Sequence, residues 1–286
     1  MAQKTLFLLS TDEPFITGSA NLSAFKQHLY KLEGAAILLC LGGEAKITID
    51  LKQYNVKKNT QVVLLPGTVV SINEISRDFK VDFFVAHGEM FHEACHRLES
   101  TFFHFLKENP CYLLPEHFTA NITGFLSAAT NIYNDNENRF RSQIARNHLQ
   151  SFLLDIYDKA YRFFTSKEIE GYNRQDELFK KFMTLIHDHC ATQREVSFYA
   201  DRLCISAKYL TNIVRATTGD SAKKIIDDFS ILELKVLLQS SELTIQEIAD
   251  QLNFPDQSYL GRYFKRHEGI SPMEYRNQSA RNAIQI

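Results

Sequence analysis

A short segment near the C-terminus carries small, polar and cationic residues at the spacing of a surface that contacts DNA. The residues are Ser258, Gly261, Arg262 and Lys265. They follow one another at helical intervals, so they fall on one face of a helix. Arginine reads guanine edges in the major groove, cations meet phosphates, and small residues let a helix approach the bases. The alternative is an ordinary surface helix with a solvated basic face.

Two short helices joined by a turn are predicted to position this face. Residues 245–252 form the first helix, with their apolar side chains on one side. Pro255 prevents a continuous helix, and Asp256 or Gln257 can cap the helix that follows. The opposite side of that second helix is apolar and carries Leu260, Tyr263 and Phe264. Residues 243–276 therefore predict a helix-turn-helix.

An earlier segment, residues 196–225, repeats this pattern. Ala200 and Asp201 match Ala249 and Asp250, and after one extra residue in the second turn Gly219 matches Gly269. The exposed face of the first copy is formed by Lys208, Thr211, Asn212 and Arg215. Two copies with matching faces, joined by a helix predicted at 221–239, indicate DNA binding more strongly than one copy alone.

Residues 176–286 resemble the AraC/XylS family of bacterial transcription regulators, most closely in LTIQEIADQLNFPDQSYLGRYFKRHEGISPMEYR. The resemblance implies two helix-turn-helix units, 196–216 and 245–267, whose recognition helices enter successive major grooves about 34 Å apart. By position, the implied DNA-facing residues are Lys208, Thr211, Asn212, Arg215, Gln257, Ser258, Gly261, Arg262 and Lys265. Phosphate contacts are expected at the helix N-termini near Ser197 and Thr244.

Three positions depart from the family pattern. Asn253 stands where glycine is usual, but asparagine tolerates the left-handed conformation, so the turn is expected to be intact. Leu260 replaces a frequent phenylalanine conservatively. Ser230 lies in the linking helix where an arginine is common, which puts the DNA contact of that arginine in question.

Short apolar runs before residue 88 predict antiparallel strands that form a small barrel or sandwich, with a barrel preferred. Residues 35–41 and 44–51 flank Gly42-Gly43 and are expected to pair as a hairpin, and further runs lie at 61–65, 68–72 and 79–86. The hairpin and LLPGTVVSI resemble, more loosely, the cupin-like sensing domain of many family members. The strands contain no HxH, so no metal site is expected, and the interior is expected to be a dry pocket or a packed core.

Helical periodicity begins at Glu89, with predicted helices at 89–107, 116–133 and 139–164. The last is long and amphipathic. It either covers the barrel or pairs with its copy in a second chain, and the sequence does not distinguish these roles. Residues 166–175 are polar and are predicted to link the two domains.

A rival motif, HExxH, occurs at residues 92–96. On a helix it places two imidazoles one turn apart for zinc, with the glutamate as general base. His92, Glu93 and His96 would need a third ligand, for which Glu116 or His117 is nearest downstream. The surrounding aromatic and aliphatic residues favour a helix packed on a core. No phosphate-binding loop or nucleophile motif accompanies it, so an enzyme is not expected.

The balance of charges limits these interpretations. The chain has 286 residues and a net charge of −2. From Arg174 onward it has 15 basic and 15 acidic residues, so DNA affinity would depend on a few well-placed cations. Five scattered cysteines indicate free thiols in a reducing cytoplasm, and no apolar run of about 18 residues predicts a membrane span.

The sequence thus predicts an α+β chain with two domains. Residues 1–165 form a cupin-like antiparallel barrel with covering and dimerisation helices, and residues 176–286 form an all-α DNA-binding domain. The implied function is effector-responsive regulation of transcription, with promoter DNA, RNA polymerase, a small-molecule effector and a second copy as partners. No cofactor is expected. The alternatives are a zinc enzyme built on residues 92–96 and a metabolite-binding module that does not bind DNA.

Overall fold

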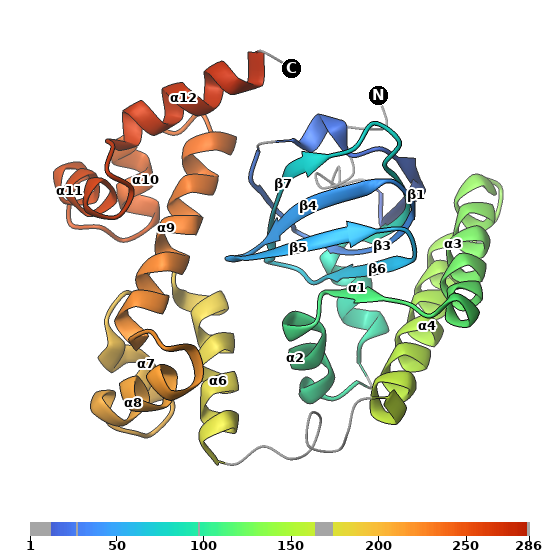
Figure 1. The fold of residues 1–286 in the computed structure, drawn as a ribbon, viewed down its shortest axis with the longest axis horizontal. Helices are drawn as coiled ribbons and strands as arrows, with labels where there is room; N and C mark the ends of the chain where they lie inside the picture. Colours follow the sequence, from blue (N-terminus) through green and yellow to red (C-terminus); the bar gives the residue numbers. More distant parts are fainter. Residues whose placement is uncertain (1–12, 27, 97, 164–173, 285–286) are drawn as a thin grey trace. The chain divides into compact units, whose positions relative to one another are not determined.

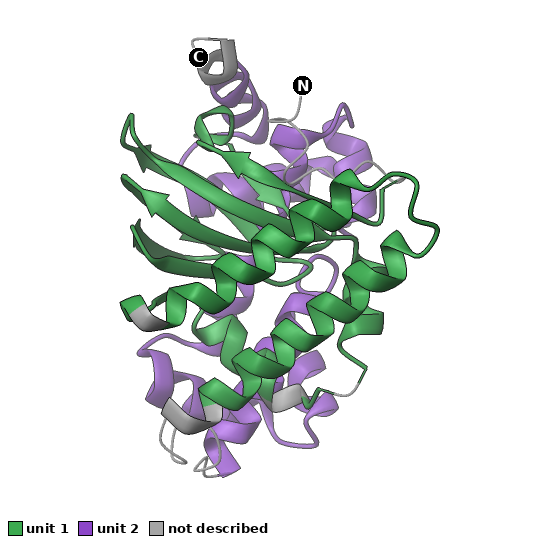
Figure 2. Cartoon of the chain, turned by 90° about the vertical axis from the view of Figure 1, so that its right-hand side faces the viewer, with its two compact units in different colours: residues 1–169 green, residues 170–286 purple. Residues whose placement is uncertain are grey.

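The computed structural model describes residues 13–26, 28–96, 98–163 and 174–284 of the chain (Figure 1). It divides into two compact units, residues 1–169 and residues 170–286 (Figure 2). Most of the predicted linker, residues 166–173, lies outside the described residues. Among the described helices, none is long and apolar enough to cross a lipid bilayer.

The strands of the N-terminal unit form two antiparallel sheets rather than one closed barrel. The strands are β1 (Phe15–Ala20), β2 (Tyr30–Lys31), β3 (Ala35–Gly42), β4 (Glu44–Ile49), β5 (Lys52–Lys57), β6 (Thr60–Leu64), β7 (Val69–Ile75), β8 (Lys80–Ala86) and β9 (Cys111–Leu113). One sheet has the order β1-β8-β3-β6-β9 and the other the order β2-β7-β4-β5. The predicted barrel is therefore an open two-sheet structure whose hydrogen-bonded ladders end at edge strands.

The predicted hairpin across Gly42-Gly43 is wrong. β3 pairs with β6 and β8, whereas β4 pairs with β5 and β7, so the chain passes from one sheet to the other at Gly43. Gly43 has φ +69, and a Cβ there would lie 2.5 Å from backbone atoms of Phe79, so only glycine fits this crossing. The burial patterns fit this separation, because β3 is buried on both faces, as in a sheet covered on both sides, whereas the side chains of β4 alternate between buried and exposed, as in a sheet with one solvated face.

Helices cover the outer face of the five-stranded sheet. They are α1 (Gly88–Ala94), α2 (Ser100–Glu108), α3 (Thr119–Asn134) and α4 (Arg141–Phe163), with short 3-10 turns η2 (Ser23–Phe25) and η3 (Glu116–Phe118). The first predicted helix is thus two helices. α3 packs on β1 and β8, and α4 lies along α3 (Figure 2).

The long helix α4 buries Ala145, Leu149 and Leu153 in the core beneath it, so it does cover the sheet layer. Apolar side chains also remain exposed on and next to this helix. Phe140 is 61% exposed and Leu154 is 44% exposed. Both roles considered for this helix, covering and pairing, therefore remain compatible with its surface.

The C-terminal unit is helical and has two hydrophobic clusters that share one helix. The helices are α6 (Arg174–His189), α7 (Val196–Arg202), α8 (Ala207–Thr218), α9 (Ala222–Ser240), α10 (Ile245–Gln251), α11 (Gln257–Glu268) and α12 (Pro272–Ile284). α9 contributes Ile226 and Phe229 to the cluster with α6, α7 and α8. Its next turns contribute Ile231 and Leu234 to the cluster with α10 and α11.

Candidate nucleic-acid interface

Local hydrogen bonds fix the second helix pair, α10 and α11. Thr244 and Glu247 form a reciprocal capping box that starts α10. Asn253 adopts φ 54, the left-handed conformation expected for the turn. The Asp256 carboxylate then accepts a hydrogen bond from the Tyr259 backbone N–H at 2.7 Å and starts α11, and Gly269, with φ 79, ends it.

The first pair, α7 and α8, has the same backbone pattern. Cys204 adopts φ 53 at the position of Asn253, a role that its residue type did not reveal. The Ile205 backbone N–H donates to the Ala200 carbonyl at 3.0 Å, and Phe254 donates to Ala249 at 2.8 Å. Ser206 caps α8 in place of Asp256, and Gly219 ends it with φ 82. The repeat seen in the sequence is therefore also a repeat in backbone geometry.

Each second helix turns its apolar side inward and the candidate DNA-facing residues outward. α8 buries Leu210, Ile213 and Val214, and α11 buries Leu260, Tyr263 and Phe264. The exposed candidates are Lys208, Asn212, Arg215, Gln257, Ser258, Arg262 and Lys265, whereas Thr211 and Gly261 are half-buried. A Cβ at Gly261 would meet nothing within 4 Å, so the absence of a side chain leaves this face of α11 open.

The cations on the exposed faces of α8 and α11 differ in their ion pairing from several lysines elsewhere in the unit. Within the described part of the chain, no acid forms an ion pair with Lys208, Arg215, Arg262 or Lys265. Lysines elsewhere in the unit are engaged, as in the pairs Lys224–Asp228 at 2.6 Å and Lys235–Glu268 at 2.6 Å. Residues 174–286 have equal numbers of basic and acidic residues, and these four cations give the exposed faces of α8 and α11 a positive charge.

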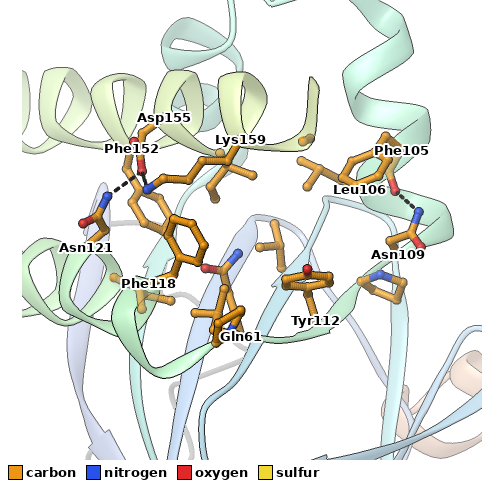
Figure 3. A pocket seen from close by; sticks show the side chains of 17 residues that line it. Gln61, Phe105, Leu106, Asn109, Tyr112, Phe118, Asn121, Phe152, Asp155 and Lys159 are labelled. Carbon is orange, nitrogen blue, oxygen red and sulfur yellow. Dashed lines mark hydrogen bonds and ion pairs between the residues drawn. The ribbon is translucent and has the colours of Figure 1, made fainter. Parts of the chain in front are cut away.

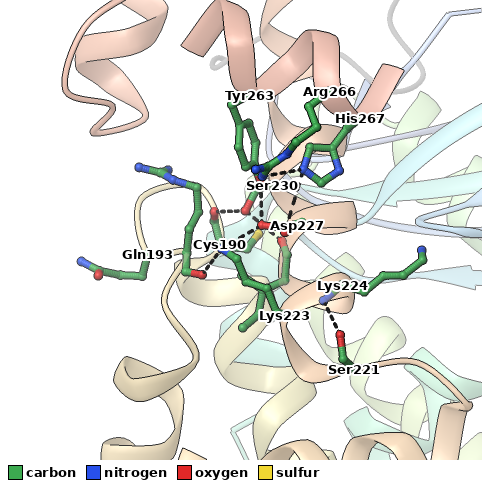
Figure 4. A network of polar contacts seen from close by, with 12 residues as sticks. Cys190, Gln193, Ser221, Lys223, Lys224, Asp227, Ser230, Tyr263, Arg266 and His267 are labelled. Carbon is green, nitrogen blue, oxygen red and sulfur yellow. Dashed lines mark hydrogen bonds and ion pairs between the residues drawn. The ribbon is translucent and has the colours of Figure 1, made fainter. Parts of the chain in front are cut away.

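A buried carboxylate, Asp227, joins α11 to α9. The Tyr263 hydroxyl donates to Asp227 Oδ1 at 2.8 Å, and Lys223 Nζ lies 3.0 Å from the same oxygen (Figure 4). The Asp227 side chain is only 8% exposed. Burial, together with the Asp227 charge, raises the pKa of Tyr263, so its hydroxyl stays protonated and continues to donate. This network fixes the rotation of α11 about its axis.

Arg194 connects the first cluster to the turn of the second pair. Its guanidinium donates to the carbonyls of Ala191 at 3.1 Å and Leu252 at 2.8 Å. It also lies 3.9 Å from the centre of the Phe254 ring. Burial lowers the pKa of Arg194. Sequence reasoning missed this residue because its partners at the second turn are nearly sixty residues away and no local pattern marks it.

Ser230, the departure in the linking helix, is buried. Its hydroxyl lies 2.8 Å from the carbonyl oxygens of both Ile226 and Cys190, and the residue is 3% exposed (Figure 4). Its small side chain lets α9 pass close to the end of α6. This position of the chain therefore serves packing rather than contact with a ligand.

The HExxH segment does not have the geometry of a zinc site. α1 ends at Ala94, so His96 lies in the following turn instead of one helical turn above His92. Glu93 forms an ion pair with Arg146 at 2.9 Å. The side chain of His117 is outside the described residues, and the described residues include no cluster of three potential metal ligands. Cys95 is buried, which raises its pKa to about 12.

Comparison with known proteins agrees with this geometry. Residues 199–278, which include most of both helix pairs, match the family model described as a helix-turn-helix domain. The chain is 27% identical over 146 residues to the arabinose operon regulatory protein of Escherichia coli K12, covering 49% of this chain and 46% of that protein. The C-terminal unit therefore carries a helix-turn-helix domain and is similar to these AraC-type regulators. The corresponding protein of Salmonella typhimurium is 32% identical over 92 residues, covering 32% of this chain and 33% of that protein.

The chain thus spans less than half the length of these AraC-family relatives. Similarity in fold covers more of this chain than similarity in sequence does. The structure of ToxT from Vibrio cholerae superposes with a TM-score of 0.50 at 14% identity, covering 92% of this chain and 98% of that one. At this identity the likeness concerns the fold alone, an N-terminal unit with antiparallel sheets followed by a helical unit.

Removing the hydroxyl that satisfies Asp227 should destabilise the C-terminal unit. Tyr263→Phe leaves a buried carboxylate with one fewer donor, at an expected cost of about 1–3 kcal/mol in the free energy of unfolding. Chemical denaturation of the full chain measures this change. Tyr259→Phe, on the exposed side of the same helix, is the matched control and is expected to change it by less than about 0.5 kcal/mol. Equal effects of the two substitutions would contradict the role assigned to the network.

Proposed function

We propose that this chain is a sequence-specific DNA-binding transcription regulator of the AraC type. The observation that carries the proposal is the pair of helices α8 and α11, each anchored by an apolar side and each exposing cations that form no ion pair with an acid among the described residues. A helix with these properties meets phosphates through its cations and base edges through its polar and small residues. The helix-turn-helix domain of the C-terminal unit and its similarity to AraC-type regulators support the same function.

In this proposal, α8 and α11 are the recognition helices of two helix-turn-helix units and enter successive major grooves of one face of the duplex. α8 would present Lys208, Thr211, Asn212 and Arg215, and α11 would present Gln257, Ser258, Gly261, Arg262 and Lys265. The N-termini of α7 near Ser197 and of α10 near Thr244 would lie against phosphates and contact them through backbone N–H groups of the first turn that the helix caps do not occupy. Ser230 has no part in the interface because it is buried.

The N-terminal unit is proposed to be a cupin-like sensing domain that also mediates dimerisation. The exposed apolar residues Phe140, Ile144 and Leu154 support a homodimer formed through the α4 region. A bound effector would act by favouring one arrangement of two DNA-binding units over another. Contact with RNA polymerase would follow from a position at a promoter. A zinc enzyme is not proposed, because residues 92–96 lack the helical arrangement that the metal requires.

Arg262→Ala is the first test of base reading. If Arg262 pairs with a guanine edge, the substitution should cost about 1–3 kcal/mol on the specific site and relax the base preference there. Arg266→Ala is the matched control, because it removes the same charge from the same helix while Arg266 packs toward His267 and Tyr263. Affinity is measured by gel shift or anisotropy on DNA from upstream of the gene and on random duplex at one salt concentration.

The two Arg variants give distinct outcomes. A selective loss on specific DNA for Arg262→Ala supports base reading. An equal loss on specific and random DNA assigns Arg262 to phosphate contact. Failure of the unsubstituted chain to distinguish the two DNAs would contradict the proposed function and favour a metabolite-binding module without DNA binding.

Arg215→Ala tests the second recognition helix independently. If α8 occupies its own major groove, footprinting should lose protection over one half of the site, about one helical turn from the half read by α11. The half read by α11 should stay protected at protein concentrations that saturate it. Asp220→Asn, at the end of α8, is a control that alters charge without removing a cation. Uniform fading of the whole footprint in Arg215→Ala would argue against two separate reading units.

A further inference from the structure

The N-terminal unit has a cavity outside its two-sheet core. Between the sheets, the remaining void is about 10 Å³ and is lined by apolar side chains such as Leu38, Ile72 and Phe79. That volume holds at most one water molecule. A cavity of about 250 Å³ lies instead between the outer face of the five-stranded sheet and the helices that cover it (Figure 3). A cavity large enough for a small molecule therefore lies beneath α4.

The walls of this cavity are mainly apolar and aromatic. Phe105 comes from α2, Phe118 from η3, Phe152 from α4 and Tyr112 from β9, with aliphatic residues between them. Flat aromatic rings supply large apolar contact area and pair favourably with another ring. Such a wall suits a compact aromatic or alicyclic body.

One polar side chain, Gln61 of β6, is buried in this wall without a partner. Gln61 is 8% exposed, and within the described residues its side-chain amide makes no hydrogen bond. Gln61 lies between Thr60 and Val62 on the strand, and its amide points into the cavity (Figure 3). The amide has no protein partner and borders the cavity, so a ligand or water that enters there can form hydrogen bonds with it.

The charges at the rim of the cavity neutralise each other. Lys159 forms an ion pair with Asp155 one turn before it on α4, and the Asn121 amide donates to the same carboxylate at 3.2 Å. The Lys159 ammonium also lies 5.5 Å from the centre of the Phe118 ring. Since each charge already has its counterpart, a ligand gains little from carrying a charge of its own.

We propose that this cavity binds a small neutral molecule with an aromatic or alicyclic body and one amide or carbonyl group that pairs with Gln61. The proposal deepens the effector-sensing role given above and rests on it for its biological meaning. A ligand here touches β6 on one side and α4 on the other, so it ties the helix to the sheet. Its hydrogen bond to Gln61 supplies specificity, and its body displaces solvent from apolar walls.

Three probes of one shape test the proposal on the full chain without DNA. Cinnamamide carries a neutral amide, cinnamate carries a carboxylate, and β-methylstyrene carries no polar group. Calorimetric titration is expected to give saturable binding of cinnamamide, at least tenfold tighter than either of the other two. Tighter binding of cinnamate would overturn the proposal in favour of an anion site at Lys159. Equal affinities, or no binding of cinnamamide up to its solubility limit, would also overturn it.

Gln61→Met separates a ligand-binding role from a structural one. Methionine keeps the length of the side chain but removes the hydrogen bond, so cinnamamide affinity should fall about tenfold, which corresponds to about one hydrogen bond. β-methylstyrene affinity should be retained. The melting temperature of the ligand-free variant should equal or exceed that of the unsubstituted chain, because an unpartnered buried amide has been removed. A lower melting temperature with unchanged cinnamamide binding would show that Gln61 is structural.

Gln53→Met is the matched control, since Gln53 is an exposed glutamine on β5 of the other sheet and should leave binding unchanged. DNA affinity is measured separately on the same preparations. A chain that binds specific DNA but not cinnamamide refutes this inference alone. A chain that binds cinnamamide in the Gln61-dependent way but no DNA refutes only the proposed function.

Discussion

The burial of α9 against two helix clusters is the constraint on which the C-terminal unit depends. One end of this helix completes the core of the first helix pair, and the other end completes the core of the second. Both helix pairs therefore pack against the same helix, and each core includes side chains of α9. Asp227 orients α11 within this packing, because the hydrogen bond from Tyr263 sets the rotation of α11 about its axis. Arg194 makes a second connection, because its guanidinium donates a hydrogen bond to the turn that precedes α11. The exposed faces of α8 and α11 are thus fixed by contacts made on their hidden sides.

The distribution of charge in the C-terminal unit also depends on contacts between its helices. A neutral total would suggest a surface with no preference for nucleic acid. Lysines on α9 instead pair with acids on α9 itself or on α11, while the cations on the outer faces of the two recognition helices have no acid partner in the described chain. A few available cations give a field that is local and sensitive to salt. Discrimination between DNA sequences would then depend more on base contacts than on general attraction.

In the N-terminal unit, the packing between the sheets and the covering layer of helices have different properties. The space between the sheets is filled by aliphatic and aromatic side chains and is close to solid. The layer between the outer sheet and the helices is packed less completely and contains the cavity that Gln61 faces. The helix that lines it, α4, also exposes the apolar residues proposed for dimerisation. A ligand that ties α4 to the sheet would therefore act on the element best placed to influence a second copy.

Features that depend on residues a few positions apart could be predicted from the amino-acid sequence. The helices of the second pair, the capping by Asp256, the left-handed turn at Asn253 and the outward face carrying Arg262 all follow from hydrogen bonds and periodicity within about one turn. The tertiary structure decided everything that depends on distant partners. It separated residues 35–41 from 44–51 into different sheets, ended α1 before His96, and brought Arg194 to Leu252 and Tyr263 to Asp227. It also left Gln61 facing a cavity. These outcomes rest on contacts between segments tens of residues apart, whose free energies depend on how all the surrounding side chains pack, and no local pattern of residues encodes that packing.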